Sequence, residues 1–532
     1  MDNDKLIIDL NYRKQIINEQ LEANAFDSYK MFDLLSETVL DKRTLLMIEI
    51  HDLYKSINHT RTMVGAARLF HSLHSPLDSI DIIHAKQESL MELEANHKLR
   101  DAVHDLIEKF SDQEKDLFKL LNVNYLPIFP YRTLKRAVKA METLISSVEN
   151  IPQPETIYLD SLVKIIKNYG KTEESRLVSK PTFRTFDGIK TRDEKHFYTP
   201  ALRFRPGWLS FGAIAPSIPL ILSLGAGIFG FIDYAVAKSL VLLTGGGVLL
   251  GGVYAFLLKP FIDDELAILP IRQRLISSDY FTSTIEAVAC LDELLSFIAF
   301  QEGIPHDTVI PEITNQERHY FVAKDLMNPI IAKNDKNYVG NDVNLDGVGL
   351  TFITGPNSGG KTTFCKTIAQ NQLLGQIGSP IVASSAQMNV ADKIVYQAPA
   401  FDSLSDPEGR FGTELKRTRD IFFDVTPKSL AILDEIAEGT TMHERLPVSA
   451  AILNGFYAKV TNTILVTHNY ELVEMFQEMN RGQALQVEFK DNKPTHRIIP
   501  GISRDSHAEI VVKKLGFTPE DIQQHLRKNG YI

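Results

Sequence analysis

The chain has only two cysteines among its 532 residues, Cys290 and Cys365. They lie far apart and neither stands at a CxxC or Cys/His spacing, which excludes a disulfide framework and a structural zinc site. We interpret both as buried thiols in a reducing compartment. The first ten residues, MDNDKLIIDL, include acidic residues and no long apolar run. We therefore expect no ordinary cleaved signal peptide.

An excess of positive charge is also missing, because the formal net charge is −10. This excludes a chain whose whole surface is built to hold polyanions, although a local basic face is compatible with nucleic-acid binding. Charge therefore permits DNA as a partner but does not favour it. The length suggests about three or four domains.

Helical periodicity dominates the first part of the chain. Val103, Leu106, Ile107 and Phe110, for example, recur at the spacing of one helix face. We predict a helical core over residues 1–150. The expected order after it is a helix with a polar connection (151–206), an apolar hairpin (207–258), returning helices (259–320), an α/β domain (321–500) and a helical tail (501–532).

The apolar hairpin is predicted from two uncharged runs, residues 206–232 and 239–258. A helix that spans a bilayer needs about 20 mostly apolar residues, and Trp208 and Tyr254 stand where interfacial aromatics are expected. We therefore predict a transmembrane hairpin that holds the chain at the cytoplasmic face of the inner membrane. The alternative is a pair of buried helices in a soluble, cytoplasmic protein.

From residue 321 onward, short β-branched runs alternate with helical stretches, which predicts a parallel sheet flanked by helices. The first of these runs, GLTFIT, is followed by GPNSGGKTT. A glycine-rich loop between a strand and a helix is the context of a P-loop, whose backbone N–H groups cradle phosphates. Lys361 would reach the β and γ phosphates and Thr362 would hold Mg²⁺. The predicted nucleotide-binding residues are Gly355, Pro356, Asn357, Ser358, Gly359, Gly360, Lys361, Thr362 and Thr363.

A second run, LAILDE, ends in Asp434 and Glu435. We expect Asp434 to hold Mg²⁺ through its water shell and Glu435 to orient and deprotonate the attacking water. A solvated acidic loop is the ordinary alternative for such a pair. The position about 70 residues after Lys361, within an α/β pattern, favours the catalytic interpretation.

A third run, TILVTH, ends in His468. A polar side chain at this point is placed to contact the γ-phosphate or the attacking water. The alternative is a structural histidine, since a lone histidine at a strand end is usually structural. We include His468 with Lys361 and Glu435 as candidate catalytic residues.

Together the blocks TGPNSGGKTT, EGRFGTELKRTRDIF, LAILDEIAEGTT and VTHNYEL resemble the ATPase domain of the MutS family in order and spacing. NDVNL before the first strand and GISRDSHAEIVVKKLGFTPEDI near the end resemble its margins. Residues 60–93 and 283–300 are similar to the start and end of that family's helical core. The resemblance implies a DNA mismatch-repair type ATPase that binds ATP with Mg²⁺ and works as a dimer.

Two departures limit what the resemblance implies. The chain begins almost at the core, which suggests a truncated member without the mismatch-recognition and connector domains. In the family a serine of the trans-acting signature approaches the partner's γ-phosphate, but here Gly409, Arg410 and Phe411 stand at that position, ahead of Glu414. Arg410 either substitutes for the serine or is a solvated loop residue.

Three functional hypotheses remain at this point. The leading one is a membrane-anchored, homodimeric MutS-like ATPase whose levers lead to the hairpin. The first alternative is a soluble mismatch-repair homologue that binds mismatched or branched DNA, with steep salt dependence. The second alternative is a nucleotide-gated membrane scaffold with negligible hydrolysis.

Overall fold

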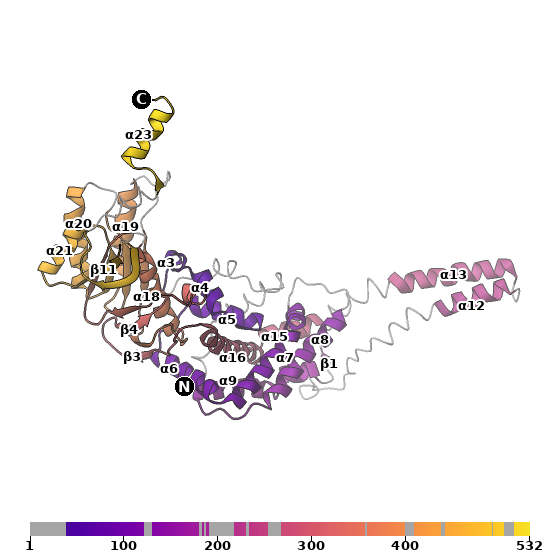
Figure 1. Ribbon diagram of the computed structural model, residues 1–532. Helices are drawn as coiled ribbons and strands as arrows, with labels where there is room; N and C mark the ends of the chain where they lie inside the picture. Colours follow the sequence, from indigo (N-terminus) through magenta and orange to yellow (C-terminus); the bar gives the residue numbers. More distant parts are fainter. Residues whose placement is uncertain are drawn as a thin grey trace. The chain divides into compact units, whose positions relative to one another are not determined.

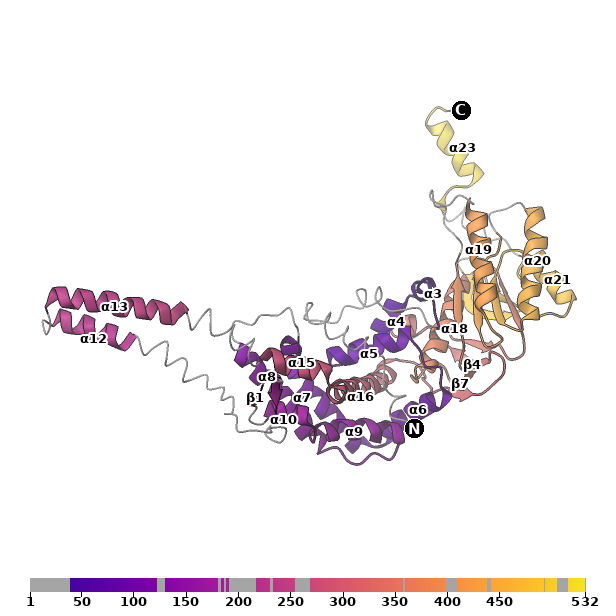
Figure 2. The ribbon, with the colours of Figure 1, turned by 180° about the vertical axis from the view of Figure 1, so that it is seen from behind.

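The computed structural model describes residues 39–121, 130–179, 183–185, 188–190, 217–229, 233–253, 268–356, 359–398, 409–437, 442–491, 493–504 and 515–531 (Figures 1 and 2). These residues form two compact units. Unit 1 contains Thr60–Arg68 and Glu92–Leu295, and unit 2 contains residues 39–59 together with Leu69–Met91 and Ser296–Ile532, within the described ranges.

Unit 1 is built mainly from helices. They are α7 (His97–Leu121), α8 (Pro130–Val148), α9 (Ile157–Tyr169), α10 (Glu173–Ser179), α12 (Ser217–Ile228), α13 (Tyr234–Val253), α15 (Leu269–Ser277) and most of α16 (Asp279–Gly303), with a short antiparallel pair β1 (Phe183–Thr185) and β2 (Gly188–Lys190). The apolar face of α7, which includes Val103 and Phe110, is buried. Burial of such a face is the main source of stability for a helix in a folded protein.

Two buried carboxylates hold the start of α5 (Met63–His74) in unit 1. Glu114 on α7 accepts hydrogen bonds from the backbone N–H groups of Met63 at 2.8 Å and Val64 at 3.0 Å. Asp292 on α16 accepts from the backbone N–H and hydroxyl of Thr62, at 2.8 and 2.6 Å. The first N–H groups of a helix have no partner within the helix, so these carboxylates satisfy groups that would otherwise be unpaired.

The predicted transmembrane hairpin is wrong. Helices α12 and α13 do lie side by side (Figures 1 and 2). However, α12 has 12 residues, which at about 1.5 Å per residue gives roughly 18 Å, while a bilayer core is about 30 Å thick. Longer α13 contains Lys238 and three consecutive glycines. Among all helices in the described ranges, none combines the length and apolar character needed to cross a membrane. The interfacial aromatics Trp208 and Tyr254 lie outside those ranges.

The main sheet of unit 2 has six strands in the order β12-β11-β6-β10-β9-β8. Its members are β6 (Leu350–Thr354), β8 (Ile394–Gln397), β9 (Leu430–Asp434), β10 (Asn462–Val466), β11 (Gln483–Lys490) and β12 (Lys493–Pro500). The strands from β11 to β8 pair in parallel, whereas β12 pairs antiparallel with β11. The sheet is therefore mixed, which corrects the predicted parallel sheet, because β11 and β12 form a tight hairpin that reverses the chain.

Helices pack against this sheet. They are α18 (Lys361–Gln376), α19 (Gly409–Asp424), α20 (Met442–Ala458) and α21 (Tyr470–Glu478), and α20 and α21 lie beside each other in both views (Figures 1 and 2). Phe352, Leu433, Leu465 and Phe476 are fully or almost fully buried within this layer. Strands with buried residues on both faces need helices on both faces, which explains the continuous apolar runs in the sequence. A further helix, α23 (Pro519–Lys528), has no buried residue.

A second sheet of unit 2 has the order β3-β7-β4-β5 and is also mixed. It is formed by β3 (Glu312–Thr314), β4 (Phe321–Leu326), β5 (Asn341–Asn344) and β7 (Ser385–Asn389). The short helix α17 (Pro329–Ala332) follows β4. The earlier segments α3 (Lys42–Met47), α4 (Ile50–Ile57) and α6 (Ile80–Ala95) complete the unit, and the hydroxyl of Thr44 on α3 accepts a hydrogen bond from the backbone of Tyr396 in β8 at 2.9 Å.

Candidate nucleotide-binding site

The three sequence motifs meet at one edge of the six-stranded sheet. Strand β10 lies between β6 and β9, and Val466 is in register with both Ile353 and Asp434. Because the three strands are parallel, the residues that follow them emerge on the same side. The P-loop, the acidic pair and the segment after β10 are thereby brought together, although more than 100 residues separate the first motif from the last.

The loop between β6 and α18 has the backbone that a phosphate cradle requires. Gly355 and Gly360 have φ of 122° and 95°, a region that favours glycine. A Cβ on Gly359 would lie 2.7 Å from the Cγ atoms of Val487 on β11, so a larger residue has no room there. Helix α18 starts at Lys361 and directs its unpaired N–H groups at this loop. Asn357 and Ser358 lie outside the described residues.

Lys361 is buried, with 1% of its surface exposed, and its ammonium group donates to the carbonyl oxygen of Gly355. Burial lowers the pKa of Lys361, while the nearby carboxylates of Asp434 and Glu435 oppose that fall. A lysine at the start of a helix, beside a glycine-rich loop, is placed to meet an anionic ligand. The phosphate-binding role expected for this residue stays a prediction.

Glu435 is held by donors from its own chain. It follows β9 with a left-handed φ of 66° and is 6% exposed. The backbone N–H of His468 donates to Oε1 at 2.8 Å, and the hydroxyl of Thr467 donates to Oε2 at 3.0 Å. The guanidinium of Arg445 on α20 donates to the same Oε2. Thr467 belongs to the run TILVTH, but only His468 was singled out there, and Arg445 lies outside the motifs. No local signal marks either residue as a contact of Glu435.

His468 takes part in this arrangement through its backbone, and its side chain is exposed. The predicted role of the imidazole, contact with the γ-phosphate or the attacking water, stays a prediction. The neighbouring Asn469 caps α21, since its side chain accepts from the backbone N–H of Leu472 at 3.1 Å. This cap keeps the segment after β10 in a defined position beside Glu435.

A Mg²⁺ ion fits the oxygen groups at this edge. Mg²⁺ usually takes one or two protein oxygens and completes its shell with phosphate oxygens and water. Asp434 supplies a half-buried carboxylate, and Thr362 supplies an exposed hydroxyl in the first turn of α18. No cluster of three or more His, Cys, Asp or Glu side chains that suits a metal occurs in the described ranges, and a P-loop Mg²⁺ site does not require one.

The segment expected to act on a partner subunit forms the first turns of α19. Gly409 and Arg410 begin the helix, Phe411 packs partly buried against the main core, and Glu414 is 3% exposed. The structure contains one chain, so the trans role of these residues stays a prediction.

A cavity of about 400 Å³ lies next to the P-loop. Gly360 and Thr363 form one wall, and Ile331, Tyr338 and His496 contribute apolar and aromatic surface. A ligand site typically combines such surface with a few polar groups, and this cavity has the size for a base and ribose. The other lining residues are Leu326, Asp335, Asn337, Val339, Asn341, Phe364 and Thr367.

The walls of this cavity are fixed by hydrogen bonds between distant segments. The side chain of Asn341 on β5 donates to the carbonyl oxygen of His496 at 3.0 Å and accepts from the N–H of Ile498 on β12 at 2.7 Å. Burial raises the pKa of Tyr338, and a hydrogen bond with Thr367 opposes the rise. Tyr338 and His496 belong to no motif in the sequence, and they line this cavity through contacts between segments that are far apart in the chain.

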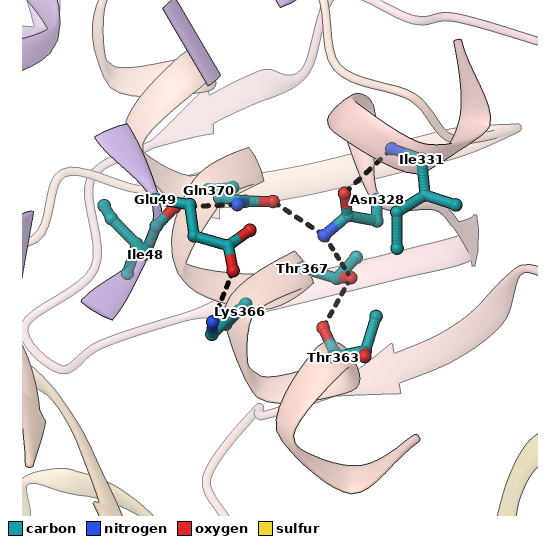
Figure 3. A network of polar contacts seen from close by, with 8 residues as sticks. All are labelled: Ile48, Glu49, Asn328, Ile331, Thr363, Lys366, Thr367 and Gln370. Atoms are coloured by element: carbon teal, nitrogen blue, oxygen red, sulfur yellow. Dashed lines mark hydrogen bonds and ion pairs between the residues drawn. The ribbon is translucent and has the colours of Figure 1, made fainter. Parts of the chain in front are cut away.

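A polar network connects α18, the helix after the P-loop, with α17 and with the joint between α3 and α4 (Figure 3). The amide of Asn328 donates to Gln370 at 2.8 Å and to Thr367 at 3.3 Å, and its oxygen caps α17. Gln370 in turn donates to the carbonyl oxygen of Ile48 at 2.8 Å. The adjacent Glu49, with φ of 58°, pairs with Lys366 at 2.8 Å.

A mostly parallel sheet with a glycine-rich loop after β6, a buried lysine at the start of the next helix and an acidic pair at the end of β9 is the arrangement typical of a P-loop domain. The chain also matches two family models, MutS domain V over residues 351–529 and MutS domain III over residues 35–297. These matches support its membership of the MutS family.

Curated relatives agree with this assignment. The chain is 25% identical to the DNA mismatch repair protein MutS of Prochlorococcus marinus over 507 residues, which are 88% of the chain and 55% of the relative. It is 32% identical to the DNA mismatch repair protein msh3 of Aspergillus oryzae over 240 residues, 42% of the chain and 20% of the relative. The chain thus spans about half or less of these relatives, and the comparisons do not support the truncated architecture expected from the sequence.

The names of the relatives and the helices of the described residues also correct the predicted function and location. The relatives are called mismatch repair proteins, and the described residues contain no helix able to cross a membrane. The hypothesis of a membrane-anchored ATPase at the inner membrane was therefore wrong. The findings fit the alternative of a mismatch-repair homologue better. The error arose because a long apolar run was interpreted without knowing where its helices begin and end.

Proposed function

We propose that this chain binds ATP with Mg²⁺ at the P-loop, hydrolyses it, and uses this cycle to act on mismatched or branched DNA as a dimer. The observation that carries the ATPase part is the meeting of Lys361, Asp434 and Glu435 at one sheet edge. The names of the relatives support the DNA part.

In the proposed reaction the protein mainly positions groups and stabilises charge, as is usual for phosphoryl transfer. The N–H groups at the start of α18 and the ammonium of Lys361 bind the phosphates. Thr362 and Asp434 would hold Mg²⁺, and the bound ion would supply positive charge to neutralise the phosphate oxygens. Glu435 accepts a proton from the attacking water and thereby strengthens it as a nucleophile.

The cavity beside Gly360 is the proposed site for the base. Ile331 is 41% exposed on its wall, so apolar surface is available to the face of a purine. Tyr338 and His496 add aromatic rings that favour stacking. We expect this cavity to add affinity for ATP beyond what the triphosphate alone provides.

Nucleotide binding and turnover test the ATPase part. Wild-type protein should bind a fluorescent ATP analogue in the presence of Mg²⁺ and release inorganic phosphate. Glu435→Gln should retain binding and lose turnover by a factor of about 100 or more. Equal turnover in the two proteins would refute the role of Glu435, and no binding by the folded wild type would refute the ATPase itself.

Fluorescence anisotropy with a matched duplex, a mismatched duplex and a four-way junction tests the DNA part. We expect tighter binding to the mismatched or branched DNA, an effect of ATP on that affinity, and a steep fall in affinity as salt rises. Equal affinity for all three DNAs, or no binding at low salt, would refute this part and leave the ATPase part standing.

A further inference from the structure

The contact between Arg445 and Glu435 is the feature of the site that ATP hydrolysis does not by itself explain. Arg445 lies in the first turn of α20. Its side chain is 21% exposed and that of Glu435 is 7% exposed. An ion pair shielded in this way is screened far less by solvent than one on an open surface.

The carboxylate of Glu435 has little capacity left for a water molecule. A carboxylate offers about four acceptor positions. The backbone of His468, the hydroxyl of Thr467 and the guanidinium of Arg445 each donate to it. A general base must have a free lone pair within hydrogen-bond reach of the proton that it removes.

The three donors are not equivalent. The contacts from Thr467 and His468 come from the segment directly after β10, and they fix the direction of the carboxylate without adding charge. Arg445 adds a full positive charge, and charge-assisted hydrogen bonds are roughly twice as strong as neutral ones. The guanidinium of Arg445 therefore competes with water for Oε2 of Glu435.

We propose that Arg445 is a positioning residue that holds Glu435 in a resting arrangement, so that separation of the pair limits ATP turnover. Removal of the guanidinium leaves Thr467 and His468 to orient the carboxylate and opens Oε2 to the attacking water. This inference rests on the proposed ATPase function. It assigns to the chain an internal restraint on hydrolysis that acts through the candidate base.

Steady-state ATPase kinetics on the full chain test this proposal. Arg445→Gln should raise kcat about tenfold, the size expected for loss of a hydrogen bond to a charged group, and leave KM for ATP within about twofold. Arg445→Lys keeps a cation without the planar fork and should give a kcat near that of the wild type. The double variant Arg445→Gln with Glu435→Gln should show no turnover, because the faster reaction still needs the base.

Arg419 provides the matched control. It is an exposed arginine on α19 whose guanidinium pairs with the adjacent Asp420 at 2.8 Å, and Arg419→Gln should leave kcat unchanged. An unchanged or lower kcat in Arg445→Gln would overturn the proposal. Binding of a fluorescent ATP analogue, measured on every variant, separates the two possible failures. Normal binding without a rise in kcat refutes the restraint alone, whereas absence of binding in the folded wild type refutes the proposed function.

Discussion

Asn328 is the residue whose removal should disturb the nucleotide-binding unit most directly. Its side chain makes four hydrogen bonds and is 3% exposed. Asn328→Ala removes the cap of α17, which costs about 1 kcal/mol. It also leaves the oxygen of fully buried Gln370 without its donor, which costs about 1–3 kcal/mol. We therefore expect the free energy of opening of unit 2 to fall by roughly 2–4 kcal/mol.

A chain of two units has no single unfolding transition, so the loss is best measured locally. Hydrogen exchange of the α18 amides does this, because those amides lie in the core of unit 2. A fall of about 2 kcal/mol corresponds to exchange that is roughly 30 times faster. Asn334→Ala is the matched control, since Asn334 is exposed and belongs to the same segment. It should change exchange by less than about threefold.

A double-mutant cycle measures the interaction between Asn328 and Gln370 directly. Asn328→Ala and Gln370→Ala should show a coupling energy of about 1 kcal/mol or more, because the two side chains are hydrogen-bonded at 2.8 Å. Purely additive effects, or exchange in Asn328→Ala that matches the control, would refute the view that this network stabilises the nucleotide-binding helix.

Three more predictions concern the cradle, the cavity and unit 1. Gly359→Ala should reduce ATP affinity at least about tenfold because its Cβ meets Val487, and Val487→Ala should restore part of the loss in a binding titration. Tyr338→Ala should weaken ATP binding about tenfold while inorganic triphosphate, measured by competition, binds as before. Burial raises the pKa of Glu114 from 4.5 to about 7, so its contribution to stability is complete below pH 4.5 and is lost as pH rises to about 7. Glu114→Gln should remove up to about 3 kcal/mol of that pH dependence, measured by hydrogen exchange in α7.

The sequence was most informative where a function depends on consecutive residues. The loop around Lys361 and the pair Asp434 and Glu435 could be located because each directly follows a buried strand, and parallel strands bring such segments to one edge. Tyr338 and His496 could not be located in this way. His496 lies more than 150 residues from Asn341, whose side chain donates to its carbonyl oxygen, and Tyr338 forms a hydrogen bond with Thr367 on α18. Neither contact is marked by a local sequence pattern.

The errors had physical causes as well. Apolar composition predicted membrane helices over residues 207–258, but the 12-residue length of α12 does not follow from composition. The antiparallel pairing of β11 with β12 makes the sheet mixed. The residues of β12 are exposed or half-buried, so the strand has no long apolar run to mark it in the sequence. Arg445 was missed because its importance lies in a contact with Glu435, ten residues away in the sequence.

We expect ATP to bind at the loop that precedes Lys361. Isothermal titration calorimetry of ATP with Mg²⁺ against the wild type and Lys361→Ala tests this expectation, and hydrogen exchange verifies that both proteins are folded. We predict binding at one site per chain in the wild type and a loss of affinity of about 100-fold or more in the variant, since a buried ammonium that faces the phosphates is removed. Equal affinity in the two folded proteins would contradict the account.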